Sequence, residues 1–185
     1  VPRIAYVNKM DINGANFDNA VQMMKDRLKA NAIPICLPIG KEDTFCGIID
    51  LVANDSIIYH DDLGKDFTVG PIPAEYADKA AEARQALMEA CAEQDDELME
   101  KFFETGELTP EEMKKAIRKG TLAMKMNPVL CGSSYKNRGV QHLLDAIVDY
   151  LPSPIDVDHV KGINPDTGEE EVRKTDDDEP FAGLA

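Results

Sequence analysis

The fold is decided by two apolar stretches that each run into polar residues: Ile4-Ala5-Tyr6-Val7 into Asn8-Lys9-Met10-Asp11, and Pro128-Val129-Leu130-Cys131 into Gly132-Ser133-Ser134. Short apolar runs of this composition predict buried strands. Apolar residues at helical spacing follow each motif: Phe17, Val21, Met24 and Leu28 after the first, and Val140, Leu143, Leu144, Ile147 and Val148 after the second. Strands that alternate with helices predict an α/β fold.

The polar residues that follow the two strands can read a guanine base. Ligands bind at the carboxyl ends of strands in an open α/β sheet. Guanine presents N1–H beside its 2-amino group, and an ionised Asp11 can accept from both. Asn8 can donate to the other edge of the base or brace a neighbouring loop, while the stem of Lys9 covers the ring face. The backbone N–H of Ser134 can donate to O6, and the Ser133 hydroxyl can orient Asp11.

Adenine would not satisfy this arrangement, because it carries an acceptor at N1 and no 2-amino group. The carboxylate of Asp11 would then be left unpaired at a cost of several kcal/mol. An alternative remains open, since Asn, Lys and Asp are common turn residues after any strand, and Ser-Ser after Gly is an ordinary loop. The joint position of the two motifs, each at the end of an apolar strand, favours base binding.

The spacing between the two motifs predicts a large insertion. Ser133 lies 122 positions after Asp11, whereas a strand–helix–strand unit takes about 30 residues, so that about 90 residues are inserted. In chain order we expect an edge strand at 33–39, a hairpin formed by 45–52 and 56–59, polar turns at 61–73, a helix at 74–94, a short helix around 98–103 and a helix from 109 to about 125. Thr109, Pro110 and Glu112 form the capping box that begins the last helix.

Composition excludes several classes of protein. The chain has 185 residues, 43% of them hydrophobic, and a net charge of −15. Its basic residues are scattered, which argues against nucleic acid as the main partner. The acidic surface is typical of a soluble cytoplasmic protein, although a patch for a basic protein partner remains an alternative. The longest uncharged run is eleven residues, Ala30–Gly40, and a membrane span needs about 20.

The four cysteines form no C-x-x-C pair, and each lies among apolar neighbours. We therefore expect buried free thiols in a reducing compartment. The three histidines share no ligand spacing with one another or with the cysteines, so we predict no metal site within this chain.

The sequence resembles the translational GTPases. Asn8-Lys9-Met10-Asp11 matches the N-K-x-D guanine-specificity motif of the GTPase superfamily, and Ser133-Ser134 is similar to its second base-contacting motif, usually Ser-Ala. Ser134 in place of Ala is tolerated if the contact comes from the backbone. Longer segments, residues 39–52, Asp149–Pro154 and Asp177–Phe181, resemble the bacterial-type elongation factor G family.

This resemblance implies the C-terminal part of a P-loop GTPase-type doubly wound sheet with an inserted α+β subdomain. Residues 1–32 and 127–154 would belong to the GTPase domain, 33–126 to the insert, and 155–185 to a linker and the start of a following β-barrel domain. Asn8, Lys9, Asp11, Ser133 and Ser134 would bind GTP or GDP. The family moves tRNA and mRNA through the ribosome by GTP hydrolysis and helps to recycle ribosomes.

No G-x-x-x-x-G-K-[ST] motif occurs in the chain. The resemblance then implies that the phosphate-binding loop, the Mg²⁺ ligands and the switch segments precede Val1 in a longer protein. Because these parts carry out phosphoryl transfer, we expect that the chain does not hydrolyse GTP by itself. We accordingly assign no catalytic residue. Two alternatives stay open: a related ribosome-binding GTPase, such as a ribosomal protection protein or a release-factor GTPase, and a non-enzymatic acidic binding module.

One side of the helix predicted at 74–94 is acidic. Asp78, Glu82, Glu89 and Glu93 lie opposite its apolar residues. Such a stripe is usually a solvated face. In the elongation factor G family the insert is implicated in contact with the ribosomal stalk protein, and the resemblance implies that these residues could complement a basic patch there.

Overall fold

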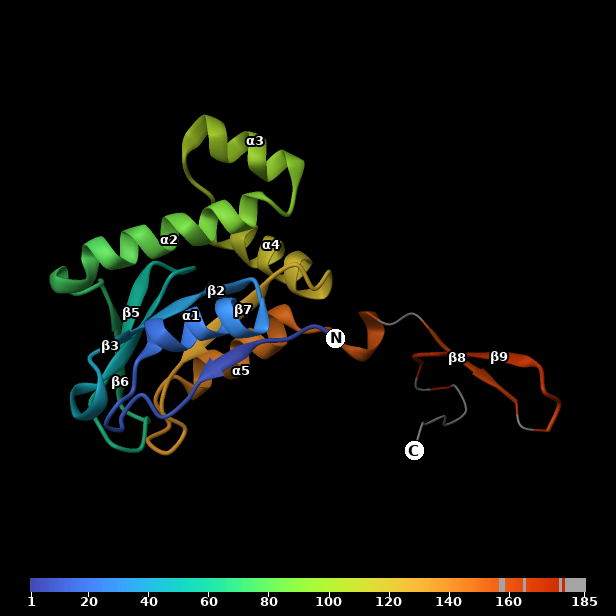
Figure 1. The fold of residues 1–185 in the computed structure, drawn as a ribbon, viewed down its shortest axis with the longest axis horizontal. Helices are drawn as coiled ribbons and strands as arrows, with labels where there is room; N and C mark the ends of the chain where they lie inside the picture. Colours follow the sequence, from blue (N-terminus) through green and yellow to red (C-terminus); the bar gives the residue numbers. More distant parts are fainter. Residues whose placement is uncertain (157–158, 165, 177, 179–185) are drawn as a thin grey trace. The chain divides into compact units, whose positions relative to one another are not determined.

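The computed structural model describes residues 1–156, 159–164, 166–176 and 178, and the chain divides into two units, Val1–Leu151 and Pro152–Ala185. Figure 1 shows the elements of the first unit in chain order: β1 (Ala5–Val7), α1 (Phe17–Leu28), β2 (Ala32–Pro34), β3 (Cys36–Ile39), β4 (Gly47–Asp50), β5 (Asp55–Tyr59), β6 (Phe67–Gly70), α2 (Ala77–Ala92), α3 (Asp96–Thr105), α4 (Pro110–Leu122), β7 (Asn127–Cys131) and α5 (Val140–Tyr150). The unit is therefore α/β, as the sequence predicted.

The two motif-bearing strands are neighbours in a parallel sheet of three strands, in the order β1-β7-β2. Tyr6 of β1 lies opposite Leu130 of β7, although the two are far apart in the sequence. Parallel neighbours end at the same edge of a sheet. The residues after β1 and those after β7 are thus brought side by side.

The segment predicted as one edge strand at 33–39 forms two strands in different sheets. β2 pairs with β7, whereas β3 pairs with β4 in an antiparallel sheet of order β3-β4-β5-β6. Ile35 lies between them: its N–H donates to the carbonyl of Val129 (3.0 Å), and its own carbonyl accepts from the N–H of Leu51 (3.1 Å). One residue thus passes the chain from the parallel to the antiparallel sheet.

The hairpin predicted between 45 and 59 is confirmed as β4 and β5, which pair antiparallel. Strand β6 was expected to be polar turns. Its residues Phe67, Thr68 and Val69 are exposed, and it forms an edge strand of the antiparallel sheet by pairing with β5. We call residues 35–126, which lie between β2 and β7 in the sequence, the intervening segment.

The helices of the intervening segment follow the predictions closely. The helix expected at 74–94 begins with a 3-10 turn, Ala74–Tyr76, and continues as α2. Helix α4 starts with the predicted capping box: the Thr109 hydroxyl accepts from the N–H of Glu112 (3.3 Å), and the Glu112 carboxylate accepts from the N–H of Thr109 (2.8 Å). Helix α4 ends at Leu122, three residues earlier than expected.

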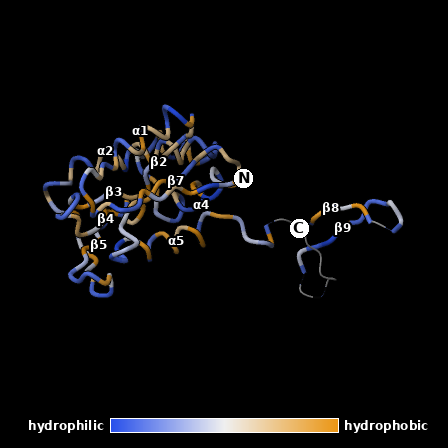
Figure 2. The backbone as a smooth tube through the Cα atoms, turned by 60° about the horizontal axis from the view of Figure 1, so that its bottom comes forward, coloured by the Kyte–Doolittle hydropathy of each residue, from blue (hydrophilic) through white to orange (hydrophobic). Residues whose placement is uncertain are grey.

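One hydrophobic core connects the two sheets of the first unit. Its largest fully buried side chains come from β4, β7, α2, α4 and several connecting segments: Phe45, Met10, Ile35, Ile48, Ile49, Leu51, Leu87, Met113, Ile117, Met126, Leu130 and Val129. Figure 2 shows the hydrophobic colouring along the strands in the middle of this unit. Both sheets therefore depend on the same buried surface.

All four cysteines are free thiols. Cys36, Cys91 and Cys131 are buried, as predicted, and Cys46 is half-buried. Burial raises the pKa of the Cys91 thiol to about 12, which keeps it protonated and unreactive at neutral pH.

The second unit contains a hairpin, β8 (His159–Ile163) with β9 (Glu170–Lys174), within the residues expected to form a linker and the start of a following domain. Residues 179–185, at the end of the segment expected to start a following domain, lie outside the described residues. Across the described part of the chain, no helix combines the length and the apolar character needed to cross a membrane.

Candidate nucleotide-base site

The loops that follow β1 and β7 are joined by backbone hydrogen bonds beyond the ends of the strands. The N–H of Gly132 donates to the carbonyl of Val7 (3.1 Å), and the N–H of Met10 donates to the carbonyl of Gly132 (3.1 Å). The Met10 side chain is only 1% exposed and anchors its loop in the core. These contacts hold the two candidate base-reading loops in a fixed register.

Asn8 and Ser134 connect the two loops directly. The Asn8 amide donates through Nδ2 to Ser134 Oγ (2.9 Å), and the backbone N–H of Ser134 donates to Asn8 Oδ1 (3.0 Å). Asn8 Oδ1 also accepts from the N–H of Lys9 (2.7 Å). Asn8 therefore braces the neighbouring loop, which is one of the two roles that the sequence suggested for it.

Asp11 is partly exposed and lies in the turn after Met10. Among the described residues, no hydrogen bond or ion pair engages its carboxylate, so both oxygens are available to a ligand. A neighbouring turn supports its loop: the N–H of Glu42 donates to the carbonyl of Met10 (2.9 Å), and Glu42 Oε1 accepts from the N–H of Gly14 (2.7 Å). The position of Asp11 is thus fixed by backbone contacts that leave its side chain free.

Ser133 and Lys9 differ in their surroundings. Ser133 is fully buried, and its hydroxyl accepts from the N–H of Lys136 (3.3 Å). Within the described part of the chain, no hydrogen bond joins Ser133 to Asp11. Lys9 is exposed and takes a left-handed backbone conformation with φ +61°, which bends the chain sharply between Asn8 and Met10.

The loop after β7 is closed on itself. Ser133 and Arg138 exchange two backbone hydrogen bonds, of 2.9 and 3.0 Å, across the turn. Gly132 has no room for a side chain, because a Cβ there would overlap the Tyr6 hydroxyl and the carbonyl of Arg138. The Tyr6 hydroxyl donates to that same carbonyl (3.4 Å). A side chain of β1 therefore supports the loop in addition to the backbone bonds beside it.

Arg138 and Glu42 support the two loops but belong to neither base-contacting motif. Arg138 is 9% exposed, and its guanidinium reaches backbone carbonyls of the intervening segment. In the sequence its only signal is a basic residue directly before the glycine that opens α5. Glu42 gave no signal, because its contacts involve backbone groups that no sequence pattern displays.

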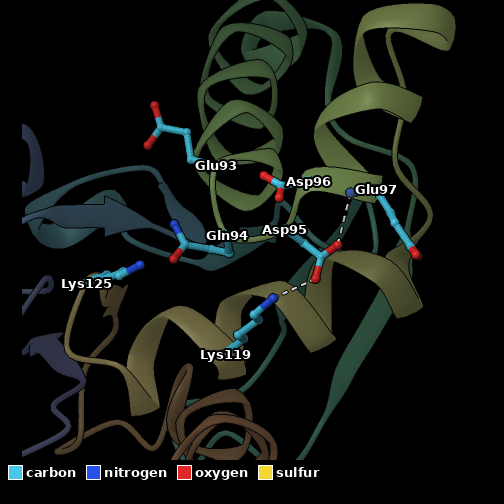
Figure 3. Close-up of a pocket in the computed structure, with 7 residues that line it drawn as sticks. All are labelled: Glu93, Gln94, Asp95, Asp96, Glu97, Lys119 and Lys125. Atoms are coloured by element: carbon cyan, nitrogen blue, oxygen red, sulfur yellow. Dashed lines mark hydrogen bonds and ion pairs between the residues drawn. The ribbon is translucent and has the colours of Figure 1, made fainter.

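A hollow in the surface lies away from these loops, at the junction of α2 and α3 (Figure 3). It is lined by charged side chains and one amide: Glu93, Gln94, Asp95, Asp96, Glu97, Lys119 and Lys125. Asp95 accepts from Lys119 Nζ (2.6 Å) and from the N–H of Glu97 (3.1 Å), which lowers the pKa of its carboxyl. The hollow therefore surrounds the start of α3, where Asp95 caps the helix and pairs with Lys119. Its carboxylates outnumber its lysines, so it repels phosphate.

The acidic residues predicted to share one side of α2 are all exposed: Asp78, Glu82, Glu89 and Glu93. The opposite side contributes Ala80, Leu87 and Ala90 to the core. Among the described residues, no group of three His, Cys, Asp or Glu side chains is placed to hold a metal ion.

Comparison with known proteins identifies the family. The sequence profile of the Elongation factor Tu GTP binding domain matches residues 1–153. A protein from Thermus thermophilus, known from its crystal structure, is similar with a TM-score of 0.74 and 28% sequence identity over 85% of this chain. The aligned part is 23% of that protein's chain, so this chain spans under a quarter of the relative's length. The match extends over both strand-end loops and the intervening segment, and the chain belongs to the Elongation factor Tu GTP-binding domain family of translational GTPases.

Proposed function

We propose that this chain is the guanine-reading part of an elongation factor of the G type. One observation carries the proposal: the reciprocal hydrogen bonds between Asn8 and Ser134 join two loops that are far apart in the sequence, beside a carboxylate, Asp11, that has no partner among the described residues. A carboxylate held in place without a partner is suited to a ligand with two adjacent donors.

Each residue has a defined role in this proposal. Asp11 accepts from N1–H and the 2-amino group of guanine, and the Lys9 stem covers the ring. Asn8 holds the Ser134 loop. The N–H of Ser134, which donates to Asn8 Oδ1 at 3.0 Å, would share its hydrogen with O6 of the bound base. Buried Ser133 supports the turn through Lys136 and acts on the base only through that support.

The phosphates of GTP or GDP and the Mg²⁺ would be bound by parts of a longer protein outside this chain, because the phosphate-loop motif is absent from the sequence. Mg²⁺ would there stabilise the charge that develops on the phosphates. The residues of this chain bind and orient the base. We accordingly propose that the chain alone does not hydrolyse GTP, and that the longer protein works in the cytoplasm, driving tRNA and mRNA through the ribosome and assisting ribosome recycling.

A contact with the ribosomal stalk protein is a further part of the proposal. The exposed carboxylates of Asp78, Glu82 and Glu89 on α2, and of Glu93 directly after it, offer negative charge to a basic partner surface. Such charges chiefly accelerate association. Replacement of Glu82 and Glu89 by Gln should slow association with the stalk protein's C-terminal domain, and the slowing should vanish at high salt.

The decisive experiment changes Asp11→Asn in a protein that carries this chain together with its phosphate-binding loop. The amide presents a donor to the 2-amino group of guanine, donor against donor. Xanthine has a carbonyl at that position and retains N1–H, so it pairs correctly with the amide. We expect ribosome-stimulated hydrolysis to move from GTP to XTP, with the affinity for GTP lowered about 10- to 100-fold.

The matched control is Asp26→Asn, the same chemical change at an exposed position of α1 to which no binding role is assigned. It should keep the preference for GTP. If Asp11→Asn also kept that preference, Asp11 would not read the base, and the roles assigned to Asn8, Lys9 and Ser134 would fall with it.

A further inference from the structure

Arg138 joins the candidate base loop to the intervening segment. Its Nη1 donates to the carbonyl of Phe45 (2.6 Å), and its Nη2 donates to the carbonyl of Asp61 (2.8 Å) and to Asp62 Oδ1 (3.2 Å). The side chain of Arg138 is 10% exposed, whereas that of Asp62 is 80% exposed. The two backbone carbonyls are therefore the structurally important acceptors, and the ion pair lies at the solvent edge.

Two amide side chains extend this contact on either side of Arg138. Asn137 Nδ2 donates to the carbonyl of Leu63 (3.2 Å), and Gln141 Nε2 donates to the carbonyl of Gly64 (2.9 Å). Gly64 approaches the backbone of Asn137 so closely that a Cβ at Gly64 would overlap it, and its φ is +64°. The backbone of residues 61–64 is thus seated directly on the loop that follows β7.

The hydroxyl of Tyr59 completes the contact at the start of α5. It accepts from the N–H of Gly139 (2.9 Å) and donates to Gln141 Oε1 (3.0 Å). Gly139 is the residue before α5 and has no side chain to cap the helix. Tyr59, on β5, therefore supplies the acceptor that the first turn of α5 lacks.

This contact leads directly to the residues assigned to the base. The backbone of Arg138 exchanges two hydrogen bonds with Ser133, and Ser134 follows and contacts Asn8. A movement of Arg138 must displace Ser133, because a turn closed by two hydrogen bonds moves as one piece. Arg138 thus connects the intervening segment to Ser133 through its side chain and one pair of backbone hydrogen bonds.

We propose that Arg138 is a positioning residue for guanine binding, which fixes the Ser133–Ser134 loop by its hydrogen bonds to the carbonyls of Phe45 and Asp61. This inference rests on the proposed function. The intervening segment then sets how tightly the base is held, and a partner that displaced residues 61–64 would loosen the nucleotide. Arg138 touches no atom of the base itself.

The test uses Arg138→Met and Tyr59→Phe in the protein that carries the phosphate-binding loop. Met keeps the apolar stem and removes the side-chain hydrogen bonds, whereas Phe removes a single hydroxyl. Stopped-flow dissociation of a fluorescent GDP should accelerate about 10- to 100-fold for Arg138→Met and about 3- to 10-fold for Tyr59→Phe. Arg138→Lys, which can reach one carbonyl, should restore part of the loss.

Arg84→Met is the matched control. Arg84 also donates to two backbone carbonyls of the intervening segment, those of Leu51 and Val52, at the far end of the β4–β5 hairpin. Its loss should lower the urea midpoint as Arg138→Met does. It should leave GDP dissociation within about twofold of the unmodified protein, since no base loop rests on it.

Three ligands separate positioning from general loosening. GDP and IDP both carry O6, and we expect the same factor of weakening for both in Arg138→Met. The diphosphate of 2-aminopurine riboside lacks O6, and its affinity, measured by competition against fluorescent GDP, should not change. Equal weakening of all three ligands would overturn the proposal.

Unchanged GDP dissociation in a folded Arg138→Met protein would overturn it as well. If Arg138→Met does not fold, the same two measurements, GDP dissociation and the comparison of the three ligands, are made on Tyr59→Phe and decide the question. A failure of the proposed function gives a different result. If Asp11 does not read the base, the Asp11→Asn variant keeps its preference for GTP, whatever the result for Arg138→Met.

Discussion

At the carboxyl ends of β1 and β7, polar groups are left for a ligand: Asn8 and Ser134 are exposed, and the carboxylate of Asp11 has no partner among the described residues. At the turns of the antiparallel sheet the opposite holds. Backbone carbonyls there are occupied by arginines of the same chain, those of Leu51 and Val52 by Arg84, and those of Phe45 and Asp61 by Arg138.

The polar groups at the ends of the two sheets therefore have different roles within one unit. The parallel sheet ends in groups that are positioned by backbone bonds and remain available. The antiparallel sheet ends in groups that are satisfied internally, so it can act as a support. Yet the two sheets share one hydrophobic core, and this makes a firm prediction about how they unfold.

The largest expected effect comes from core truncation. Leu130→Ala on β7 and Ile49→Ala on β4 each remove a side chain that is 0% exposed and should lower the free energy of unfolding by about 2–5 kcal/mol. Because the core is shared, both should shift a single urea transition seen by circular dichroism. Val69→Ala, on exposed β6, should change stability by less than about 0.5 kcal/mol. Two separate transitions would mean that the sheets are independent folding units.

A smaller effect is expected at the start of α4, the helix that packs on β7, α2 and α5. Thr109→Ala removes the hydroxyl that accepts from the N–H of Glu112 and should cost about 1 kcal/mol in the same urea experiment. Thr109→Ser keeps the acceptor and should restore most of the stability. A Ser variant as weak as Ala would show that the methyl group, and not the cap, is important.

The smallest effect should be at Asp95, which caps α3, a helix with no buried residue. The hydrogen bond from Lys119 holds the pKa of Asp95 below its usual value. A lowered pKa stabilises the fold above the unfolded pKa, near 4, and this contribution is lost as the pH falls through the folded pKa. Asp95→Asn keeps a cap acceptor and removes the charge. Its urea midpoint should lie below that of the unmodified protein at pH 7 and coincide with it near pH 2.

The elements that could be predicted from the sequence are those whose pattern is local. The strands β1 and β7, the β4–β5 hairpin and the Thr109 capping box each depend on residues a few positions apart. The sequence did not predict β6, because a short exposed edge strand has no apolar face, and its pairing with β5 supplies the structure. Nor could it divide residues 33–39, since the change of sheet at Ile35 depends on Val129 and Leu51, which are distant in sequence.

The candidate site divides in the same way. Asn8, Lys9, Asp11, Ser133 and Ser134 were predicted from two short motifs, and the structure brings the two loops together. The contact expected between Ser133 and Asp11 is not among the hydrogen bonds of the described residues. Arg138 was missed because its acceptors are peptide carbonyls, which every residue has and no motif marks.

The pairing of β2 with β7 has a consequence for how the intervening segment can change in evolution. The chain leaves the parallel sheet at Pro34 and returns at Asn127, and Pro34 lies opposite Val129 in the same pair of strands. The cost of closing a loop grows only as the logarithm of its length. With its two ends held on adjacent strands, a segment here can change in length with little change in loop-closure cost. A segment exchanged by recombination would have to supply the core side chains that the two sheets share. The exchanged segment would also have to supply backbone carbonyls that accept from Arg138, as those of Phe45 and Asp61 do.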